Sequence, residues 1–255
     1  MGQLKTKHIG GIAGTMASGT KINRCSFAGI LTDAGTNTVG GIVGYADQTA
    51  NVISNSINYG RVQSKGSETN TGGILGYVNY ASFKISHCVN VGNVSGNTTY
   101  AGQIIGRQMK AMTTLPSNLY YLDGGTLTAY GSGTNETSAT GVTAVNAEQL
   151  ASGEVCYKLN GDQTEINWYQ TLQADPYPVL DFTHKIVFHN DTDGYYNQND
   201  IKGDMNGDGK VDIADAVSIL NLMAEGGENP DADQNGDGKI DIADFVTILN
   251  LMAEQ

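Results

Sequence analysis

Two stretches near the C-terminal end carry oxygen-bearing side chains at the same spacing. Aspartate or asparagine recurs at positions 1, 3, 5, 9 and 12 of each stretch, glycine stands at position 6, and the two stretches begin 29 residues apart. Calcium takes about six to eight oxygen ligands, and loops of this pattern add the backbone carbonyl of position 7. The sequence therefore predicts two calcium ions. The candidate ligands are Asp204, Asn206, Asp208, Lys210, Asp212 and Asp215 in the first loop and Asp233, Asn235, Asp237, Lys239, Asp241 and Asp244 in the second.

Each loop is followed by a helical pattern but is not preceded by one. The segments before the loops, 197–203 and 226–232, are short, polar and interrupted by glycine or proline. After the loops, apolar residues recur at helical spacing over 213–225 and 242–254. The sequence therefore predicts one loop-plus-helix unit used twice, whereas an ordinary EF-hand has a helix on both sides of its loop.

This duplicated unit, with aspartate at position 12, resembles the dockerin family over residues 202–255. Dockerins bind a cohesin domain on another protein. The resemblance implies two calcium ions, two antiparallel helices, a cohesin-like partner and a binding face just after the loops and along the helices. Many dockerins carry Ser-Thr or similar at positions 10 and 11, where this chain has Ile213-Ala214 and Ile242-Ala243. That departure leaves the identity of the partner open.

The two helices carry more apolar residues than one shared core can cover. Helical spacing predicts core residues at Ile213, Val217, Leu220 and Ala224, and at the equivalent positions of the second helix, Ile242, Val246, Leu249 and Ala253. The remaining apolar side chains then predict a surface for another protein, although packing on the upstream part of the chain is an alternative. With the two Ile-Ala pairs, the candidate partner-binding residues are Ile213, Ala214, Ile219, Leu222, Met223, Ile242, Ala243, Ile248, Leu251 and Met252.

Negative charge is concentrated in the same region. The chain of 255 residues has a net charge of −12, and residues 200–255 hold 13 of its 26 acidic residues but only 3 of its 14 Lys and Arg residues. Without metal these carboxylates repel one another, so we expect the region to be largely unfolded in the absence of calcium. An acidic chain gives no support for nucleic-acid binding, which needs a basic surface.

The N-terminal part of the chain repeats. Gly-Gly-Ile-x-Gly begins at Gly10, Gly40 and Gly72, and a degenerate copy begins at Gly102, so the spacings are 30, 32 and 30 residues. A fixed period of this size, with short alternating segments bounded by Gly, Asn, Ser and Thr, predicts a β-solenoid. About 30 residues suffice for one coil of three short strands.

Over residues 10–106 these repeats resemble the GLUG repeat of bacterial surface proteins. The resemblance implies a parallel β-helix-like solenoid with an adhesive or spacer role and brings no catalytic residues. Two cysteines, Cys25 and Cys88, fall at equivalent positions two coils apart, which is too far for a disulfide. We expect them to be small buried residues, and Cys156 lies in a separate segment.

The period breaks after residue 108. The pattern predicts a last degenerate strand at 118–122, a helix over 147–159 capped by Asn146 and Gln149, and a strand at 185–189. A solenoid needs a cap over its open end, and Trp168, Tyr169 and Tyr177 are candidates for that plug.

The predicted fold class is mainly β. We expect a GLUG β-solenoid at 1–108, a mixed α/β capping region that closes it at 109–190, a linker at 191–200, and a small all-α, dockerin-like calcium module at 201–255.

No catalytic motif is evident, so we predict a protein that is not an enzyme. The four histidines, His8, His87, His184 and His189, share no metal-ligand spacing. Tyr45 and Tyr77 recur in phase, which favours a structural aromatic ladder over a platform for a carbohydrate or a host surface ligand.

The remaining expectations concern location and role. No stretch is long enough to span a membrane, and the first residues lack the apolar segment of a signal peptide. We therefore expect a fragment of a larger secreted or cell-surface bacterial protein, trimmed at its N-terminus. The favoured function is a non-catalytic adhesin or spacer with a calcium-dependent docking module. The alternative is the C-terminal part of a larger extracellular hydrolase that degrades polysaccharide or peptide and is tethered through its dockerin.

Overall fold

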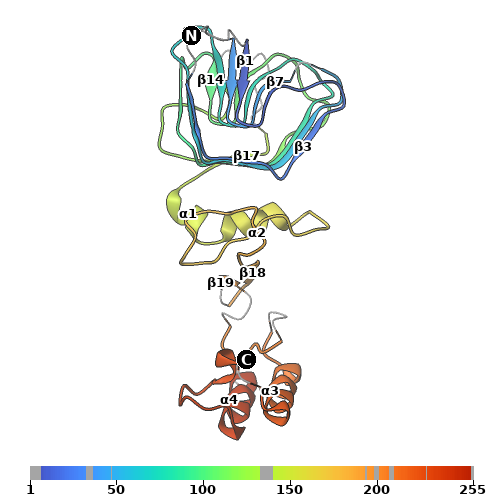
Figure 1. The fold of residues 1–255 in the computed structure, drawn as a ribbon, viewed down its shortest axis with the longest axis vertical. Helices are drawn as coiled ribbons and strands as arrows, with labels where there is room; N and C mark the ends of the chain where they lie inside the picture. The colour runs from blue at the N-terminus through green and yellow to red at the C-terminus, as the bar shows by residue number, and fades with distance from the viewer. Residues whose placement is uncertain are drawn as a thin grey trace.

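The computed structural model describes residues 7–32, 37–46, 48–132, 140–192, 194–197, 201–206, 210–227 and 229–253. A β-solenoid comes first, followed by the short helices α1 (Ala147–Ala151) and α2 (Glu154–Asn160), a β-hairpin and a C-terminal pair of helices (Figure 1). The prediction of a mainly β fold with a solenoid and a small helical region is confirmed, and the solenoid has about 4 turns.

Successive coils of the solenoid place their strands side by side in parallel sheets. The first sheet contains β1 (His8–Gly10), β6 (Thr38–Gly40), β10 (Asn70–Gly72) and β14 (Ala101–Gly102), and the second contains β2 (Ala13–Thr15), β7 (Val43–Ala46), β11 (Leu75–Val78) and β15 (Ile105–Gln108). The third contains β3 (Lys21–Asn23), β4 (Ser26–Phe27), β8 (Val52–Asn58), β12 (Lys84–Asn90), β16 (Ser117–Leu122) and β17 (Val142–Val145), and the fourth contains β5 (Ile30–Thr32), β9 (Arg61–Gln63) and β13 (Val94–Ser95).

The glycine repeat forms a corner of each coil. Gly10, Gly40, Gly72 and Gly102 pair with one another in register along the first sheet. In the second coil, β6 ends at Gly40 and β7 begins at Val43. A Cβ atom on Gly40 would lie 1.8 Å from the carbonyl oxygen of Val43, so no larger residue fits the corner. Because the corner separates β6 from β7, the second and third coils have four short strands each, rather than the three predicted.

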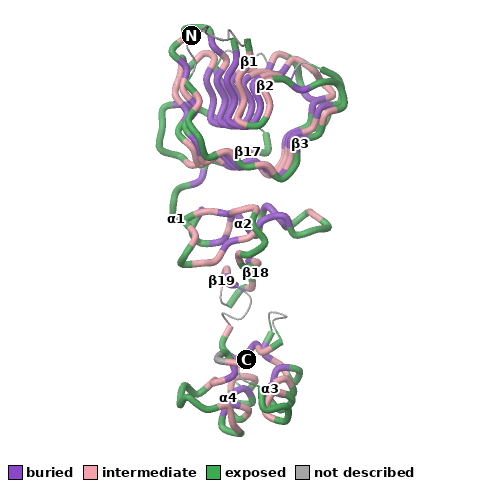
Figure 2. Tube along the Cα trace, in the orientation of Figure 1, coloured by how far each residue is buried: buried purple, intermediate pink, exposed green. Residues whose placement is uncertain are grey.

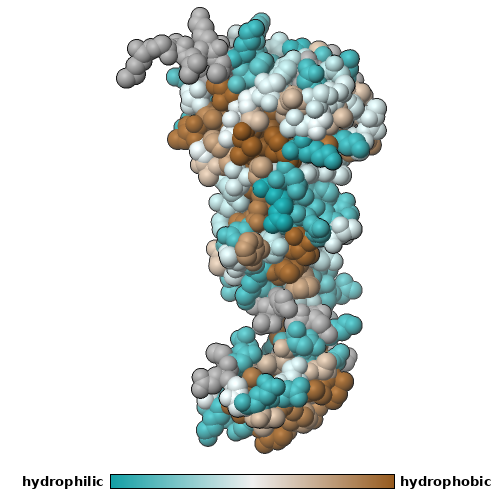
Figure 3. Space-filling view, turned by 45° about the vertical axis from the view of Figure 1, so that its right-hand side comes forward, coloured by the Kyte–Doolittle hydropathy of each residue, from teal (hydrophilic) through white to brown (hydrophobic). Residues whose placement is uncertain are grey.

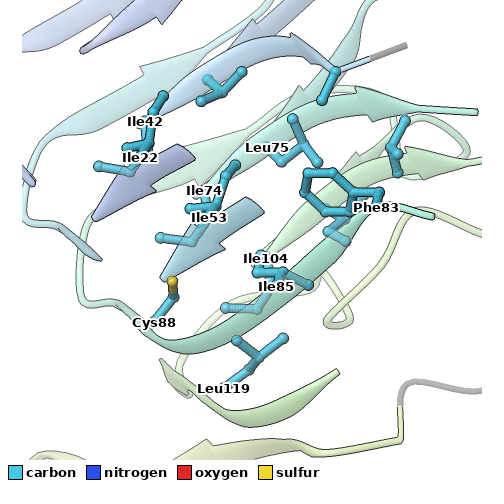
Figure 4. Packing of buried hydrophobic residues seen from close by; sticks show 14 of the residues in the cluster. Ile22, Ile42, Ile53, Ile74, Leu75, Phe83, Ile85, Cys88, Ile104 and Leu119 are labelled. Atoms are coloured by element: carbon cyan, nitrogen blue, oxygen red, sulfur yellow. The ribbon is translucent and has the colours of Figure 1, made fainter. Parts of the chain in front are cut away.

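The isoleucine of the repeated motif is buried in the second, third and fourth copies, whereas Ile12 of the first copy is exposed. Ile42, Ile74 and Ile104 are fully buried and stack on one another through the coils (Figure 4). Ile53 and Ile85, from the paired strands β8 and β12, lie opposite them. Burial is greatest along these stacked strands (Figure 2), because each coil covers the next.

The expected absence of a disulfide between Cys25 and Cys88 is confirmed, but of these two residues only Cys88 is buried as expected. Cys88 pairs in register with Ser56, the backbone N–H of Cys25 donates to Ser56 Oγ at 3.4 Å, and all three cysteines are free. Cys88 is fully buried, and burial raises the pKa of its thiol to about 12. Cys25, at the end of the ladder, is only half-buried.

The last strands extend the solenoid by one more coil. The strand expected at 118–122 is β16, and β17, which was not predicted, pairs with it in parallel. Buried Met112, Ala129 and Tyr130 join the solenoid core near its C-terminal end. The helix predicted over 147–159 is two helices, because Gly153 breaks it with a φ of 90°. The capping box of Asn146 and Gln149 is confirmed.

The segment that follows packs on the side of the solenoid, not over its end. Trp168 and Tyr177, expected to plug the open core, belong to a second apolar cluster with side chains from four paired strands of the third sheet: Ile57, Val89, Tyr120 and Val145. Side chains alternate along a strand, so the neighbours of the inward-facing residues face outward and need cover. The indole N–H of Trp168 donates to Asn55 Oδ1 at 3.1 Å and fixes this contact.

The C-terminal region begins beyond an antiparallel hairpin of β18 (Val187–Asn190) and β19 (Gly194–Asn197). It contains α3 (Ile213–Glu225), a 3₁₀ turn at Pro230–Ala232, and α4 (Ile242–Ala253), close to the predicted helices. Among the described residues, no helix combines the length and the apolar character needed to cross a membrane.

Candidate functional site

The two candidate calcium loops end in the same local structure. Asp212 caps α3, and its Oδ1 accepts the N–H of Ala214 at 2.8 Å. Asp241 accepts the N–H of Ala243 at the same distance, 2.8 Å. Aspartate at loop position 9 therefore satisfies a free N–H at the start of each helix, as an N-cap residue does.

The aspartate at position 12 joins the start of each loop to the start of its helix. Asp215 accepts the N–H groups of Met205 and Asn206 through Oδ1 at 2.8 and 3.0 Å, and that of Asp212 through Oδ2 at 2.7 Å. Asp244 repeats the pattern with Gln234 and Asn235 at 2.8 and 3.1 Å, and with Asp241 at 2.8 Å. Both side chains are buried. A buried carboxylate is tolerated here because three N–H groups bond to it.

These contacts keep the Asp244 carboxylate charged. Burial alone raises its pKa, but the N–H groups of Asp241, Asn235 and Gln234 favour the ionised form, and together they lower the pKa below its ordinary value. Asp244 is therefore a carboxylate at neutral pH and keeps lone pairs that could face a cation.

The second loop winds around its first residue. Asp233 Oδ1 accepts the N–H groups of Gly236 and Asp237 at 2.8 and 3.1 Å, and Oδ2 accepts that of Gly238 at 2.8 Å. Gly236 and Gly238 have φ angles of 77° and 83°, in the left-handed region that glycine adopts most readily. The positive φ of Gly238 explains why glycine stands at position 6 of the loop.

The donor chemistry of this loop suits calcium. Its candidate ligands are carboxylate, amide and backbone carbonyl oxygens, the hard ligands that calcium prefers, and bound calcium would cancel part of their negative charge. Within the described part of the chain, however, no group of three or more His, Cys, Asp or Glu residues gathers as a metal site. The carboxylates of Asp233, Asp237 and Asp244 accept backbone N–H groups instead.

The first loop is described only in part. Asp204 is buried, Asn206 and Lys210 are exposed, and Asp212 and Asp215 repeat the contacts of the second loop. Asp208, a candidate ligand, lies outside the described residues.

The predicted core stripe of the helices is wrong. Ala216, Ile219 and Ile248 are buried and form the core with Val211. The six residues expected to lead that core are instead exposed by 36–61%: Ile213 61%, Val217 47%, Leu220 40%, Ile242 58%, Val246 46% and Leu249 36%. We call these six residues the apolar face. Figure 3 shows hydrophobic residues on the surface at this lower end of the molecule.

The direction of Asp215 explains the reversal. Its carboxylate is held inward against the loop, and residues four and eight positions later, Ile219 and Met223, lie on the same side of the helix. Asp244 and Ile248 are related in the same way.

The candidate partner-binding residues divide accordingly. Ile219 and Ile248 are buried and cannot contact a partner, which corrects that part of the prediction. Ile213, Ala214, Ile242 and Ala243 are exposed, and Leu222, Met223, Leu251 and Met252 are half-buried. Sequence reasoning missed Val217, Leu220, Val246 and Leu249 as surface residues. The inward-pointing aspartate at position 12 was the signal that could have found them.

The remaining candidates serve structural contacts. Tyr45 stacks on Tyr77 with ring centroids 5.3 Å apart and on His8 at 4.2 Å, which supports the structural aromatic ladder. His87 Nε2 lies 2.7 Å from Asp162, and His184 Nδ1 lies 2.6 Å from Asp175. His87 and His184 therefore contact two different aspartates, and neither aspartate belongs to a calcium loop.

Comparison with known families identifies the C-terminal region. Residues 202–253 match the family model of the dockerin type I domain. Dockerin type I domains bind calcium, dock onto cohesin domains and have no catalytic activity of their own, and proteins that carry them are typically extracellular or on the cell surface. No curated protein and no solved structure is similar enough to match the chain.

Proposed function

We propose that residues 201–255 bind two calcium ions and then dock the chain onto a cohesin-like domain of another protein. The observation that carries this proposal is the apolar face, on which each exposed residue of α3 has a counterpart of nearly equal exposure on α4. Exposed apolar residues gathered on one face are typical of a protein-binding surface.

The duplication of the loop-plus-helix unit predicts two orientations of docking. Ile213, Val217 and Leu220 correspond to Ile242, Val246 and Leu249, and the hydrogen bonds at the two helix starts are the same. We expect a half turn of this region to exchange the two triplets. One partner surface can therefore meet either triplet, and each helix serves as the main contact in one of two orientations.

The test measures binding to cohesin domains encoded by the source organism, in calcium and in EDTA. Val217→Glu with Leu220→Glu disables one triplet, and Val246→Glu with Leu249→Glu disables the other. We expect each pair alone to weaken binding less than tenfold and all four changes to weaken it more than a hundredfold. Asn221→Ala with Asn250→Ala, exposed polar positions on the same helices, is the control.

Two outcomes contradict the proposal. Loss of binding from one triplet alone rules out the two orientations. Failure of every cohesin domain to bind in calcium rules out docking itself.

The residues before the docking module have a proposed role of their own. We propose that the coils at 1–108 are GLUG repeats forming a non-catalytic adhesin or spacer. Of the region 109–190 expected to cap them, β16 and β17 instead continue the solenoid and the later part packs on its side. The expected linker at 191–200 contains β19, so the docking module follows the β18–β19 hairpin. A secreted or cell-surface bacterial protein suits calcium-dependent docking. The docking role is the same if the chain is the C-terminal part of a larger extracellular hydrolase.

A further inference from the structure

A pocket of 570 Å³ opens where the solenoid meets the segment packed on its side. Pockets that hold small molecules are typically about 300–1,000 Å³. The solenoid contributes Ser26, Ala28 and Tyr59, and the packed segment contributes Tyr177, Val179, Leu180, Asp181 and His184. The pocket is separate from the calcium loops, and the proposed docking function does not use it.

Two tyrosines form an aromatic wall. The ring centroids of Tyr59 and Tyr177 lie 5.1 Å apart, and the ring planes are inclined by 36°. The Tyr59 hydroxyl donates weakly to the carbonyl of Pro178 at 3.5 Å. Burial, with smaller contributions from Tyr177 and Asp175, raises the pKa of Tyr59, so its phenol stays neutral. Because the rings are inclined rather than parallel, they cover each other less completely than Tyr45 and Tyr77, whose planes differ by only 5°.

Four polar groups of the lining have no hydrogen-bond partner among the described residues: Ser26 Oγ, Tyr177 Oη, Asp181 Oδ2 and His184 Nε2. The other polar atoms of two of these residues are already engaged. Asp181 Oδ1 accepts the N–H and the hydroxyl of Thr183, both at 2.9 Å. His184 Nδ1 lies 2.6 Å from Asp175 Oδ2, a contact that orients the ring.

The wall that carries these groups is built before any ligand arrives. Val179 and Tyr169 exchange backbone hydrogen bonds of 2.8 and 2.9 Å, and the N–H of Gln170 donates to the carbonyl of Lys185 at 2.8 Å. Asp175 Oδ2 also accepts the N–H of Thr171 at 2.6 Å. Preorganisation of this kind lowers the entropy that a ligand must overcome on binding.

We propose that this pocket binds a neutral saccharide of one or two rings. The tyrosine rings with Val179 and Leu180 suit the apolar face of a sugar ring, and the four polar groups suit its hydroxyls. Among the described residues no lysine or arginine lines the pocket, and Asp181 disfavours phosphate or carboxylate ligands.

The test is calorimetric titration of the full chain with three neutral disaccharides: cellobiose, maltose and lactose. We expect saturable binding of at least one of them. Tyr177→Ala should weaken that binding at least tenfold, because it removes an aromatic ring and a hydroxyl. Asp181→Asn should weaken it at least threefold, because it replaces a charged acceptor. The controls are Tyr80→Ala, a half-buried tyrosine elsewhere, and Asp123→Asn, an exposed aspartate that likewise accepts a local backbone N–H.

The outcomes separate this proposal from the docking function. Saccharide binding should persist in EDTA, whereas docking should not. The proposal is overturned if none of the three sugars binds, if glucuronate or inorganic phosphate binds more tightly than all of them, or if Asp181→Asn leaves binding unchanged. Because the Asp181 side chain is exposed, that variant decides the question even if Tyr177→Ala fails to fold.

Discussion

Asp215 and Asp244, two of the proposed calcium ligands, also hold the loops and helix starts together. Each buried carboxylate accepts three backbone N–H groups that belong to the loop or to the helix start. Glutamate, the usual residue at position 12 of an EF-hand, is longer by one methylene. The shorter aspartate accepts N–H groups from both ends of the first loop here.

Removing the first residue of either loop should remove one calcium ion. We expect the wild-type chain to bind two ions, and Asp204→Ala or Asp233→Ala to bind one, because position 1 supplies a carboxylate around which the second loop is wound. Titration calorimetry in metal-free buffer measures the number of sites. Asp231→Ala, an exposed aspartate just before the second loop, is the control and should still bind two. Two sites remaining in either loop variant would contradict the ligand assignment.

The thiols should differ in reactivity. Burial raises the pKa of Cys88 to about 12, and it also raises that of Cys156, so at pH 8 only about one Cys88 in 10⁴ is a thiolate. We expect iodoacetamide to modify half-buried Cys25 in the native chain and to leave Cys88 and Cys156 intact, as measured by peptide mass spectrometry. All three should react in guanidinium. Equal modification of Cys88 and Cys25 in the native chain would show that the coils open readily.

At the scale of elements, the helix pair shows where sequence reasoning stops. Loop spacing alone located the candidate ligands and the starts of both helices. It did not determine which side of each helix is buried, because apolar residues occur all around α3 and α4. A stripe of period 3.6 can be drawn through either set. The hydrogen bonds of Asp215 decide between them, and these depend on contacts across the loop that spacing does not specify.

Adjacent residues on α3 should therefore behave differently. Ile219→Ala removes a fully buried side chain and should destabilise the calcium-loaded C-terminal region by about 2–5 kcal/mol. Leu220→Ala changes an exposed residue and should cost about 0.5 kcal/mol or less, while it weakens docking. Urea unfolding, followed by hydrogen exchange of α3 and α4, measures the free energy of unfolding of each variant. Equal destabilisation by the two variants would mean that α3 is rotated about its axis and that Leu220 is as buried as Ile219.

The stacking of the coils was easier to predict, because the spacing of the repeated motif gives the register of one coil on the next. The sequence did not show that the motif divides one strand into two, since that depends on how closely coils approach. A Cβ on Gly73 would lie 2.1 Å from the carbonyl oxygen of Gln103 in the next coil.

Gly73→Ala should thus strain the stack. We expect a drop of several degrees in the melting temperature of the solenoid, because the clash is with backbone that cannot move alone. Gly161→Ala is the control, since its φ is −57° and an added Cβ would meet nothing closer than 3.6 Å. Differential scanning calorimetry compares the two. An unchanged melting temperature for Gly73→Ala would show that neighbouring coils can separate at this corner.

At the scale of the whole molecule, the position of the segment after the solenoid was the least predictable feature. Ile57, Val89 and Tyr120 follow inward-facing residues along their strands, and their apolar character indicates that something covers the outer face. Nothing in the local pattern says which segment does so. The answer depends on long-range contacts such as the hydrogen bond between Trp168 and Asn55, which are 113 residues apart.

Removal of metal should unfold the C-terminal region and leave the solenoid folded. The candidate ligands all lie in 204–244, and the region around them is strongly acidic, whereas the solenoid is held by an apolar core that contains none of them. In EDTA, repulsion among the unneutralised carboxylates should unfold the C-terminal region, because metal binding there supplies folding free energy. Hydrogen exchange should show loss of protection in α3 and α4 but unchanged protection in β8 and β12. Restoring calcium should restore the helices. Magnesium at the same concentration is the control, because it binds poorly to flexible sites of oxygen ligands. Persistent protection of α3 and α4 in EDTA would mean that the helix pair folds without metal, and docking could not then be switched by calcium through folding.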